Sequence, residues 1–531
     1  MPTSQSIDTI SPGNNLKMDN NLAQVLLVKD IRPDALSDYF GNSSNPRKLI
    51  EFNDKLYFSA YDGENGYELW VSDGTNEGTQ LLADIKPGSS GSYPAGFNDI
   101  FIEFNEKLYF SADDGENGYE LWVSDGTNEG TQLLADIDPS PSGYNTPNNL
   151  FEFNDRLYFS AFAVGIGREL WVSDGTNDGT QLLADIAPGS SGSIPNNLIG
   201  FDDKLYFTAY TDENGRELWV SDGTNEGTQL FVDLNPGTTG SKPDNLFEFN
   251  EKLYFAADDG ENGRELWVSD GTAEGTQLLV DLRPGSSESN PRKLVESNGK
   301  LYFTANDGEN GTELFVSDGT AEGTQLVVDL RPGSFGSYPD KLVESNDKLY
   351  FTANNGENGR ELFVSDGTVE GTQLLADIYP GLSESNPRYL IEFNDQLYFL
   401  ANDSENGVKL FISNGTAEGT GLAANIDSGL SSDGSFPKDL TVVGDELFFT
   451  AFDDDIGREL YKLVIDEPIA IEGSEDDDNL IGSQDLEQIY GFAGDDTIDA
   501  VGSNDTIDGG DGSDRIFGSS KGNDSLIGGG G

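Results

Sequence analysis

The sequence contains no cysteine and no histidine among its 531 residues. Disulfide bridges, cysteine nucleophiles and serine–histidine triads are therefore excluded. Zinc sites, which rely on cysteine and histidine ligands, are excluded as well. Without histidine, the general acid of a carboxylate-based glycosidase or lyase would be an Asp or a Glu of raised pKa.

Basic residues are scarce, with 30 Lys and Arg against 96 Asp and Glu, for a formal net charge of −66. A surface this negative repels the phosphates of nucleic acids and anionic lipids, so we exclude both as partners. The acids are spread along the chain rather than gathered in one tail, so the composition does not indicate wholesale disorder. Such a surface attracts cations.

Long apolar runs are also missing. Residues 1–20 contain no apolar stretch that could serve as a Sec-type signal, and no segment approaches the length of a transmembrane helix. An exported form of this protein would need another route, and we expect type I secretion.

A repeat of about 48 residues fills most of the chain. The phrase GYELWVSDGTNEGTQLLADI occurs twice verbatim, at 66–85 and 118–137, and degenerate copies follow at intervals of 48 to 52 residues. One unit reads as four strands (LIEF, KLYFSAYD, YELWVS and QLLADI) separated by turns rich in Gly, Asn and Asp. Four strands in about 48 residues are typical of one β-propeller blade.

The connector PGSSGSYP is long enough to cross from an outer edge strand to the next inner strand, so LIEF should be innermost and QLLADI outermost. The last unit, 440–463, lacks an outer strand, and the segment 24–31 should supply it and close the ring. We therefore predict an all-β propeller of nine blades over 24–463, with eight or ten as alternatives because four to eight are usual. The repeated phrase ELWVSDGT resembles the ELWxxDGT-repeat proteins of environmental bacteria, a family defined by its repeat rather than by a reaction.

After Pro468, Asp and Gly dominate. Five nonapeptides run without a gap over 473–517, each with an apolar residue in step, and a sixth covers 518–527 with one residue inserted. Aligned on G-G-x-G-x-D-x-U-x, they resemble the hemolysin-type calcium-binding repeats of repeats-in-toxin proteins. The resemblance implies a parallel β-roll over 473–531. We expect a linker at 464–472 before this roll, and a disordered segment at 1–23 before the propeller. Such families carry a C-terminal secretion signal that the closing GGGG does not match, which indicates a C-terminally truncated fragment.

In such a roll two nonapeptides complete one coil, so units two apart stack on the same edge. Glycines expose backbone carbonyls, and the sixth-position acid supplies a hard oxygen ligand suited to calcium. One edge carries Asp478, Asp496 and Asp514, and the other carries Glu487, Asp505 and Asp524. We expect Ca²⁺ first at the first edge, because its units keep the template glycines. The predicted metal-site glycines are Gly491, Gly494, Gly509, Gly510 and Gly512.

The propeller offers three further sets of acids. The aspartates of the DGT turns should cap those turns through backbone hydrogen bonds; they are Asp73, Asp125, Asp174, Asp222, Asp270, Asp318 and Asp366. Asp114 and Glu116 in the DGENG turn suggest either an ordinary hairpin turn or a loose cation site. A glutamate precedes the Leu–aromatic pair of each unit, with Lys409 as the exception, and we interpret it as a structural contact; the set is Glu68, Glu120, Glu169, Glu217, Glu265, Glu313, Glu361 and Glu459.

Near-identical blades favour a non-enzymatic function, because catalysis needs unlike residues that converge at one place. We therefore predict a secreted or cell-surface calcium-binding propeller that serves as a binding, adhesion or surface-layer module. An extracellular glycan or a cell-surface component would be its partner. The alternative is a carboxylate-based glycosidase or polysaccharide lyase on a propeller scaffold. The sequence leaves the ligand and the oligomeric state open.

Overall fold

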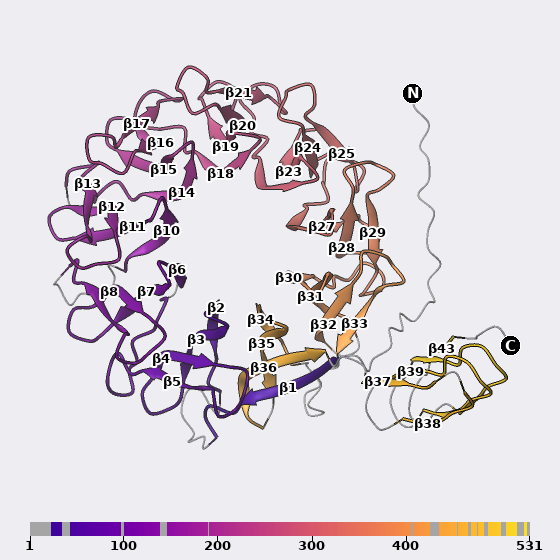
Figure 1. The fold of residues 1–531 in the computed structure, drawn as a ribbon. Helices are drawn as coiled ribbons and strands as arrows, with labels where there is room; N and C mark the ends of the chain where they lie inside the picture. The colour runs from indigo at the N-terminus through magenta and orange to yellow at the C-terminus, as the bar shows by residue number, and fades with distance from the viewer. Residues whose placement is uncertain are drawn as a thin grey trace, which may run out of the picture.

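The protein consists of a closed ring of β-sheets followed by a small roll of parallel strands (Figure 1). The computed structural model describes residues 23–33, 43–96, 100–138, 146–189, 191–404, 407–424, 435–453, 455–465, 469–474, 476–482, 487–500, 506–517 and 525–527. These residues form strands and turns, with no helix among them. The predicted disordered segment 1–23 lies outside the described residues except for Ala23.

Nine four-stranded antiparallel sheets form the blades of a β-propeller, which confirms the predicted fold class and blade count. The innermost strands are β2 (Arg47–Phe52), β6 (Ile102–Phe104), β10 (Asn148–Phe153), β14 (Asn196–Phe201), β18 (Asp244–Phe249), β22 (Arg292–Ser297), β26 (Asp340–Ser345), β30 (Arg388–Phe393) and β34 (Lys438–Val443). The second strands are β3 (Lys55–Tyr61), β7 (Lys107–Asp113), β11 (Arg156–Ala163), β15 (Lys204–Thr211), β19 (Lys252–Asp258), β23 (Lys300–Asn306), β27 (Lys348–Asn354), β31 (Gln396–Asn402) and β35 (Glu446–Asp453).

The third strands are β4 (Tyr67–Ser72), β8 (Tyr119–Ser124), β12 (Gly167–Ser173), β16 (Gly215–Ser221), β20 (Arg264–Ser269), β24 (Thr312–Ser317), β28 (Arg360–Ser365), β32 (Val408–Ser413) and β36 (Gly457–Ile465). The outer strands are β5 (Gln80–Ala83), β9 (Gln132–Ala135), β13 (Gln181–Ala184), β17 (Gln229–Val232), β21 (Gln277–Val280), β25 (Gln325–Val328), β29 (Gln373–Ala376), β33 (Thr420–Ala424) and, for the ninth blade, β1 (Ala23–Lys29). The N-terminal strand β1 pairs antiparallel with β36, so the ring closes as predicted (Figure 1).

Local chemistry explains the hairpin at the start of each blade. The two-residue turn between β2 and β3 places Asn53 and Asp54 at φ angles of 51° and 56°, and Asn and Asp tolerate this left-handed region better than other residues with a Cβ.

The first strands of successive blades contact one another, as β22 does β26, so the LIEF-type strands are innermost as predicted (Figure 1).

The core of the ring lies between blades rather than within them. Phe52 and Tyr57 of the first blade pack with Phe110 and Trp122 of the second, and equivalent clusters recur around the ring. Each sheet therefore carries apolar residues on both faces, which explains why aromatic and aliphatic side chains follow one another along KLYF and ELWV without strict alternation.

The roll consists of two parallel sheets. One contains β37 (Ile469–Glu472), β39 (Glu487–Tyr490), β41 (Thr506–Asp508) and β43 (Ser525–Ile527), and the other contains β38 (Asn479–Ile481), β40 (Thr497–Asp499) and β42 (Arg515–Phe517). The roll begins at Ile469 rather than at Gly473, because β37 pairs with β39 although its sequence IAIE lacks the glycine template. The predicted linker 464–472 is therefore too long, since it includes the first strand of the roll.

Candidate metal centre

The apolar residues of the nonapeptides fix the stacking of the roll. Ile489, Ile498 and Ile507 are fully buried, with Leu480 and Ile516 packed against them, so the predicted inward positions are confirmed. Ile498 pairs with Leu480 on one side and with Ile516 on the other, 18 residues away in each direction. This register places equivalent positions of alternate units directly above one another.

The structure brings Asp478, Asp496 and Asp514 together in one column. The backbone N–H of Asp478 donates to Oδ1 of Asp496 at 2.8 Å, and the N–H of Asp496 donates to Oδ1 of Asp514 at 3.0 Å. The carboxylates of Asp496 and Asp514 therefore each bind the preceding coil through one oxygen. Oδ2 of Asp478 accepts hydrogen bonds from the N–H and the hydroxyl of Ser474.

Asp496 differs from its neighbour in the column. Its side chain is 1% exposed, yet its Oδ2 has no hydrogen-bond partner among the residues that the structure describes. A buried carboxylate oxygen without a donor or a cation is costly. The hydroxyl donor that Ser474 provides in the preceding coil is absent here, because Phe492 occupies the equivalent position.

The glycine that begins each unit on this edge lies against the carboxylate of its own unit. A Cβ at Gly491 would lie 2.5 Å from Oδ2 of Asp496 and 2.5 Å from the carbonyl oxygen of Gly509. A Cβ at Gly509 would likewise lie 2.6 Å from Oδ2 of Asp514. Carboxylate and carbonyl oxygens thus converge where any larger residue would intrude, which is the physical reason for glycine at these positions.

The remaining predicted glycines hold the turns of the same edge. Gly494, Gly510 and Gly512 have φ angles of 119°, 77° and 155°, which lie outside the range that other residues readily adopt. A Cβ at Gly512 would lie 1.8 Å from the carbonyl oxygen of Gly494, so the turns of successive coils are in close contact. All five predicted metal-site glycines therefore lie on the Asp478–Asp496–Asp514 edge.

The second edge is described only in part. Glu487 begins strand β39, while Asp505 and Asp524 lie outside the described residues. Within the described part of the chain, no group of three or more Asp and Glu side chains is arranged to hold a metal ion. A cation on the first edge would therefore take most of its ligands from backbone carbonyls, with one carboxylate from each coil.

A second carboxylate column on this edge was missed by the sequence analysis. Asp477 Oδ1 accepts the N–H of Asp495 at 2.9 Å, and Asp495 Oδ1 accepts the N–H of Ser513 at 3.0 Å. Its signal was the Asp doublet, which occurs at 477–478 and again at 495–496. These exposed carboxylates hold successive turns together by accepting hydrogen bonds from backbone N–H groups.

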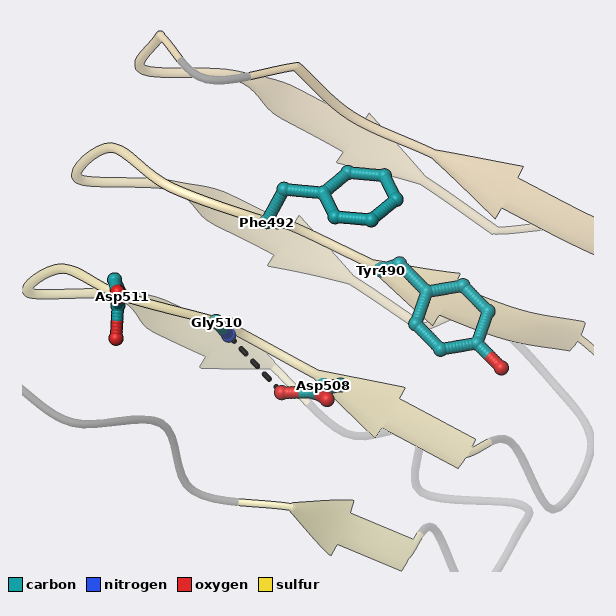
Figure 2. Close-up of a pocket in the computed structure, with 5 residues that line it drawn as sticks. All are labelled: Tyr490, Phe492, Asp508, Gly510 and Asp511. Atoms are coloured by element: carbon teal, nitrogen blue, oxygen red, sulfur yellow. Dashed lines mark hydrogen bonds between the residues drawn. The ribbon is translucent and has the colours of Figure 1, made fainter.

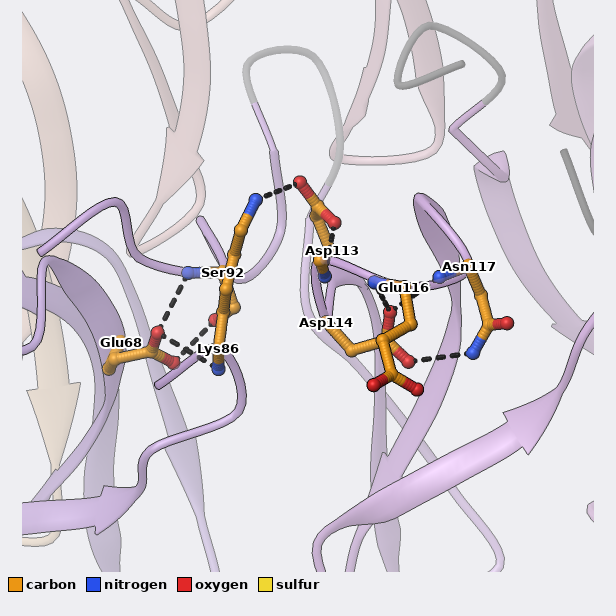
Figure 3. A network of polar contacts seen from close by, with 8 residues as sticks. Glu68, Lys86, Ser92, Asp113, Asp114, Glu116 and Asn117 are labelled. Atoms are coloured by element: carbon orange, nitrogen blue, oxygen red, sulfur yellow. Dashed lines mark hydrogen bonds and ion pairs between the residues drawn. The ribbon is translucent and has the colours of Figure 1, made fainter. Parts of the chain in front are cut away.

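The recurring glutamates of the propeller hold each blade to the connector that leads to the next one. Glu68 accepts hydrogen bonds from the N–H groups of Ile85, Lys86 and Ser92 and from the Ser92 hydroxyl, at 2.5 to 3.3 Å (Figure 3). All eight glutamates of the set are at most 2% exposed. The structural interpretation of these residues is therefore confirmed, and Lys409 is equally buried in the eighth blade.

The turn aspartates also have a structural role, because each accepts hydrogen bonds within its own turn. Asp73 Oδ1 accepts both the N–H and the hydroxyl of Thr75, and all seven aspartates of the set repeat this pattern. Asp114 accepts the N–H groups of Glu116 and Asn117 through one oxygen and the Asn117 amide through the other (Figure 3). These contacts support the ordinary-turn interpretation of Asp114 and Glu116.

The buried glutamates predict a pH-dependent stability. Burial raises the pKa of Glu68 to about 7 and that of Glu361 to about 8, against the lowering effect of their hydrogen-bond donors. Because these pKa values lie above the ordinary value of 4.5, the glutamates stabilise the fold fully below pH 4.5, and this contribution is lost as the pH rises through about 7 to 8. We expect the melting temperature of the propeller to fall by several degrees between pH 6 and pH 9, as measured by calorimetry.

High salt provides the control for this prediction. Repulsion within the −66 net charge also changes with pH, but salt screens exposed charges far more than buried ones. The fall should therefore persist in high salt, and an unchanged or rising melting temperature across this window would contradict it.

No known family model matches this chain, and no curated protein does. Solved structures do match. The computationally designed Ika8 protein is 19% identical, with a TM-score of 0.38 over 72% of this chain and 98% of that one. A puromycin hydrolase is 12% identical, with a TM-score of 0.37 over 69% of this chain and 61% of that one. A Mycobacterium tuberculosis puromycin-hydrolyzing peptidase is 10% identical, with a TM-score of 0.40 over 89% of this chain and 66% of that one.

The chain spans less than two thirds of the length of the puromycin hydrolase and about two thirds of the mycobacterial peptidase. With TM-scores below 0.5, these likenesses carry no argument about activity. Among the described residues, no helix is long and apolar enough to cross a membrane.

Proposed function

We propose that this protein binds calcium on the Asp478–Asp496–Asp514 edge of its roll, outside the cell or on its surface, and that the propeller serves as a non-enzymatic binding or adhesion module. The buried Oδ2 of Asp496, which has no hydrogen-bond partner in the part of the roll that the structure describes, is the observation that carries the calcium proposal. Oδ2 of Asp496 and the carbonyl oxygen of Gly509 each lie 2.5 Å from the position that a Cβ would take at Gly491, so the two oxygens lie close together beside this glycine. A cation that bridges the two oxygens, clear of the Gly491 backbone, would satisfy both.

The chemistry of these ligands favours Ca²⁺. Calcium takes six to eight hard oxygen ligands and accepts irregular geometry, which suits carbonyls supplied by successive turns. One carboxylate for each coil leaves the site with little charge of its own, so the affinity should be low. Extracellular calcium modules bind with dissociation constants of about 0.1 to 1 mM, and calcium at this level is available outside cells. The proposed location follows from this affinity.

The non-enzymatic part rests on how the propeller uses its acids. The eight recurrent glutamates are buried and accept hydrogen bonds from the connectors. The seven turn aspartates each bind a threonine two residues later. A glycosidase needs a pair of accessible carboxylates across a scissile bond. The glutamates are buried, and the exposed aspartates lie one to a blade, each bound within its own turn.

A calcium titration of the full-length protein tests the proposal. We expect a gain of β-signal in circular dichroism with a midpoint of about 0.1 to 1 mM. In calorimetry a second transition should appear with calcium and disappear with a chelator, while the propeller transition stays unchanged. A titration without change would contradict the calcium proposal, and calcium-independent turnover on a polysaccharide panel would contradict the non-enzymatic one.

A further inference from the structure

A small pocket opens on the roll between two successive coils (Figure 2). Tyr490 and Phe492 come from one coil, and Asp508, Gly510 and Asp511 come from the next. The pocket encloses about 320 Å³. Tyr490 is the register partner of Asp508 in the parallel pair β39–β41, so an aromatic ring and a carboxylate lie on adjacent strands.

The two aromatic rings form one wall of this pocket. Their centroids are 6.2 Å apart and their planes differ by 24°, so the rings are stacked nearly parallel to each other. Phe492 keeps 49% of its surface exposed. The aromatic wall is therefore open to a ligand from solvent.

Phe492 departs from the glycine template of its unit. It occupies the second position of its unit, where the template has glycine, and its φ angle is 70°. The equivalent residue of the next coil, Gly510, has a φ angle of 77°. A residue with a Cβ costs on the order of 1 kcal/mol in this region, which the burial of about half of the Phe492 side chain roughly offsets.

Two carboxylates form the opposite part of the pocket. Asp508 Oδ1 accepts the N–H of Gly510 at 3.1 Å (Figure 2). Among the described residues, Asp508 Oδ2 and both side-chain oxygens of Asp511 accept no hydrogen bond from the protein. The five described lining residues include no Lys or Arg, so they carry only negative charge.

We propose that this pocket binds an organic cation, namely an ammonium group carried on an apolar or sugar body. The faces of aromatic rings attract cations, and carboxylates add direct charge pairing. A neutral sugar would use the rings but leave both negative charges unpaired, and an anion would be repelled. The net charge of −66 also draws cations toward the protein. This inference goes beyond the proposed function and depends on it only in that the roll is studied with calcium.

Calorimetric titration of the full-length protein in saturating calcium tests the pocket with matched probes. Choline is compared with its uncharged isostere, in which carbon replaces the nitrogen, and glucosamine is compared with glucose. We expect choline and glucosamine to bind at least about tenfold more tightly than their uncharged counterparts. Equal binding of glucose and glucosamine, or of choline and its isostere, would overturn the proposal.

Two substitutions locate the site. Phe492→Gly restores the template glycine and removes one aromatic ring from the pocket wall. Choline binding should therefore weaken by about tenfold, while the calcium titration stays unchanged. Asp511→Asn removes one exposed charge and should weaken choline binding with little effect on its isostere. Unchanged choline binding in both variants would place the site elsewhere and overturn the proposal.

The calcium titration of the same samples separates this inference from the proposed function. A flat calcium titration contradicts the proposed function, whereas a flat choline titration contradicts the pocket whatever calcium does.

Discussion

Asp496→Asn should raise the calcium concentration that orders the roll by at least about tenfold. The reason is that a charged carboxylate ligand contributes more binding free energy than a neutral group does. The amide keeps an oxygen that can accept the N–H of Asp478, so the contact between coils survives. What the variant loses is the negative charge beside the carbonyl oxygen of Gly509. The midpoint of the calcium titration in circular dichroism measures the effect.

Asp476→Asn is the matched control. It removes one carboxylate from the same stretch of the roll, but the Asp476 side chain is exposed, and it is the backbone N–H of Asp476 that binds the Ser474 hydroxyl. The control should shift the midpoint by far less than tenfold. Equal shifts in the two variants would show that general charge, rather than a ligand at Asp496, governs the calcium response.

Deletion of residues 1–32 should destabilise the propeller more than any single substitution. Strand β1 supplies the outer strand of the ninth blade, and Val28 and Ile31 are buried against the first blade. Losing these side chains costs roughly 3–6 kcal/mol before the lost strand pairing is counted, which is a large share of the stability of a typical protein. We expect a clear fall in the urea midpoint of the propeller transition.

Polar contacts at the closure should add to this loss. The N–H of Ile31 donates to Glu459, and the Lys29 ammonium donates to the carbonyl oxygens of Asn76 and Thr79 in the first blade. Without β1, strand β36 would also become an exposed edge and a site of self-association. A deletion of residues 1–22 alone serves as the control. If both deletions leave the same urea midpoint, β1 does not close the ring in solution.

Much of the architecture was readable from the sequence because it depends on local periodicity. A repeat of about 48 residues with four strand patterns defined the blades, and the missing outer strand at 440–463 identified β1 as the closing strand. In-step apolar residues such as Ile489 and Ile498 likewise predicted the coils of the roll. The start of the roll was placed too late, because β37 belongs to it through pairing with β39 rather than through any glycine pattern.

The partners of the buried acids could not be read in this way. The sequence indicated that Glu68 is structural, but its donors lie 17 to 24 residues further along the chain, in a connector with no pattern that points to it. The same holds for Asp477 and Asp495, whose bonds depend on the vertical stacking of coils.

By itself, the sequence determined the blade repeat, the order of strands in a blade, the closing strand and the edge of the roll that carries the template glycines. These features repeat at fixed spacing, so each local segment carries the information. Only the tertiary structure decided that Asp496 keeps a buried oxygen without a donor from the described residues, and that Phe492 and Tyr490 share a pocket with Asp508 and Asp511. The physical reason is that these contacts join residues of different coils, whose side chains meet only after the parallel strands are in register.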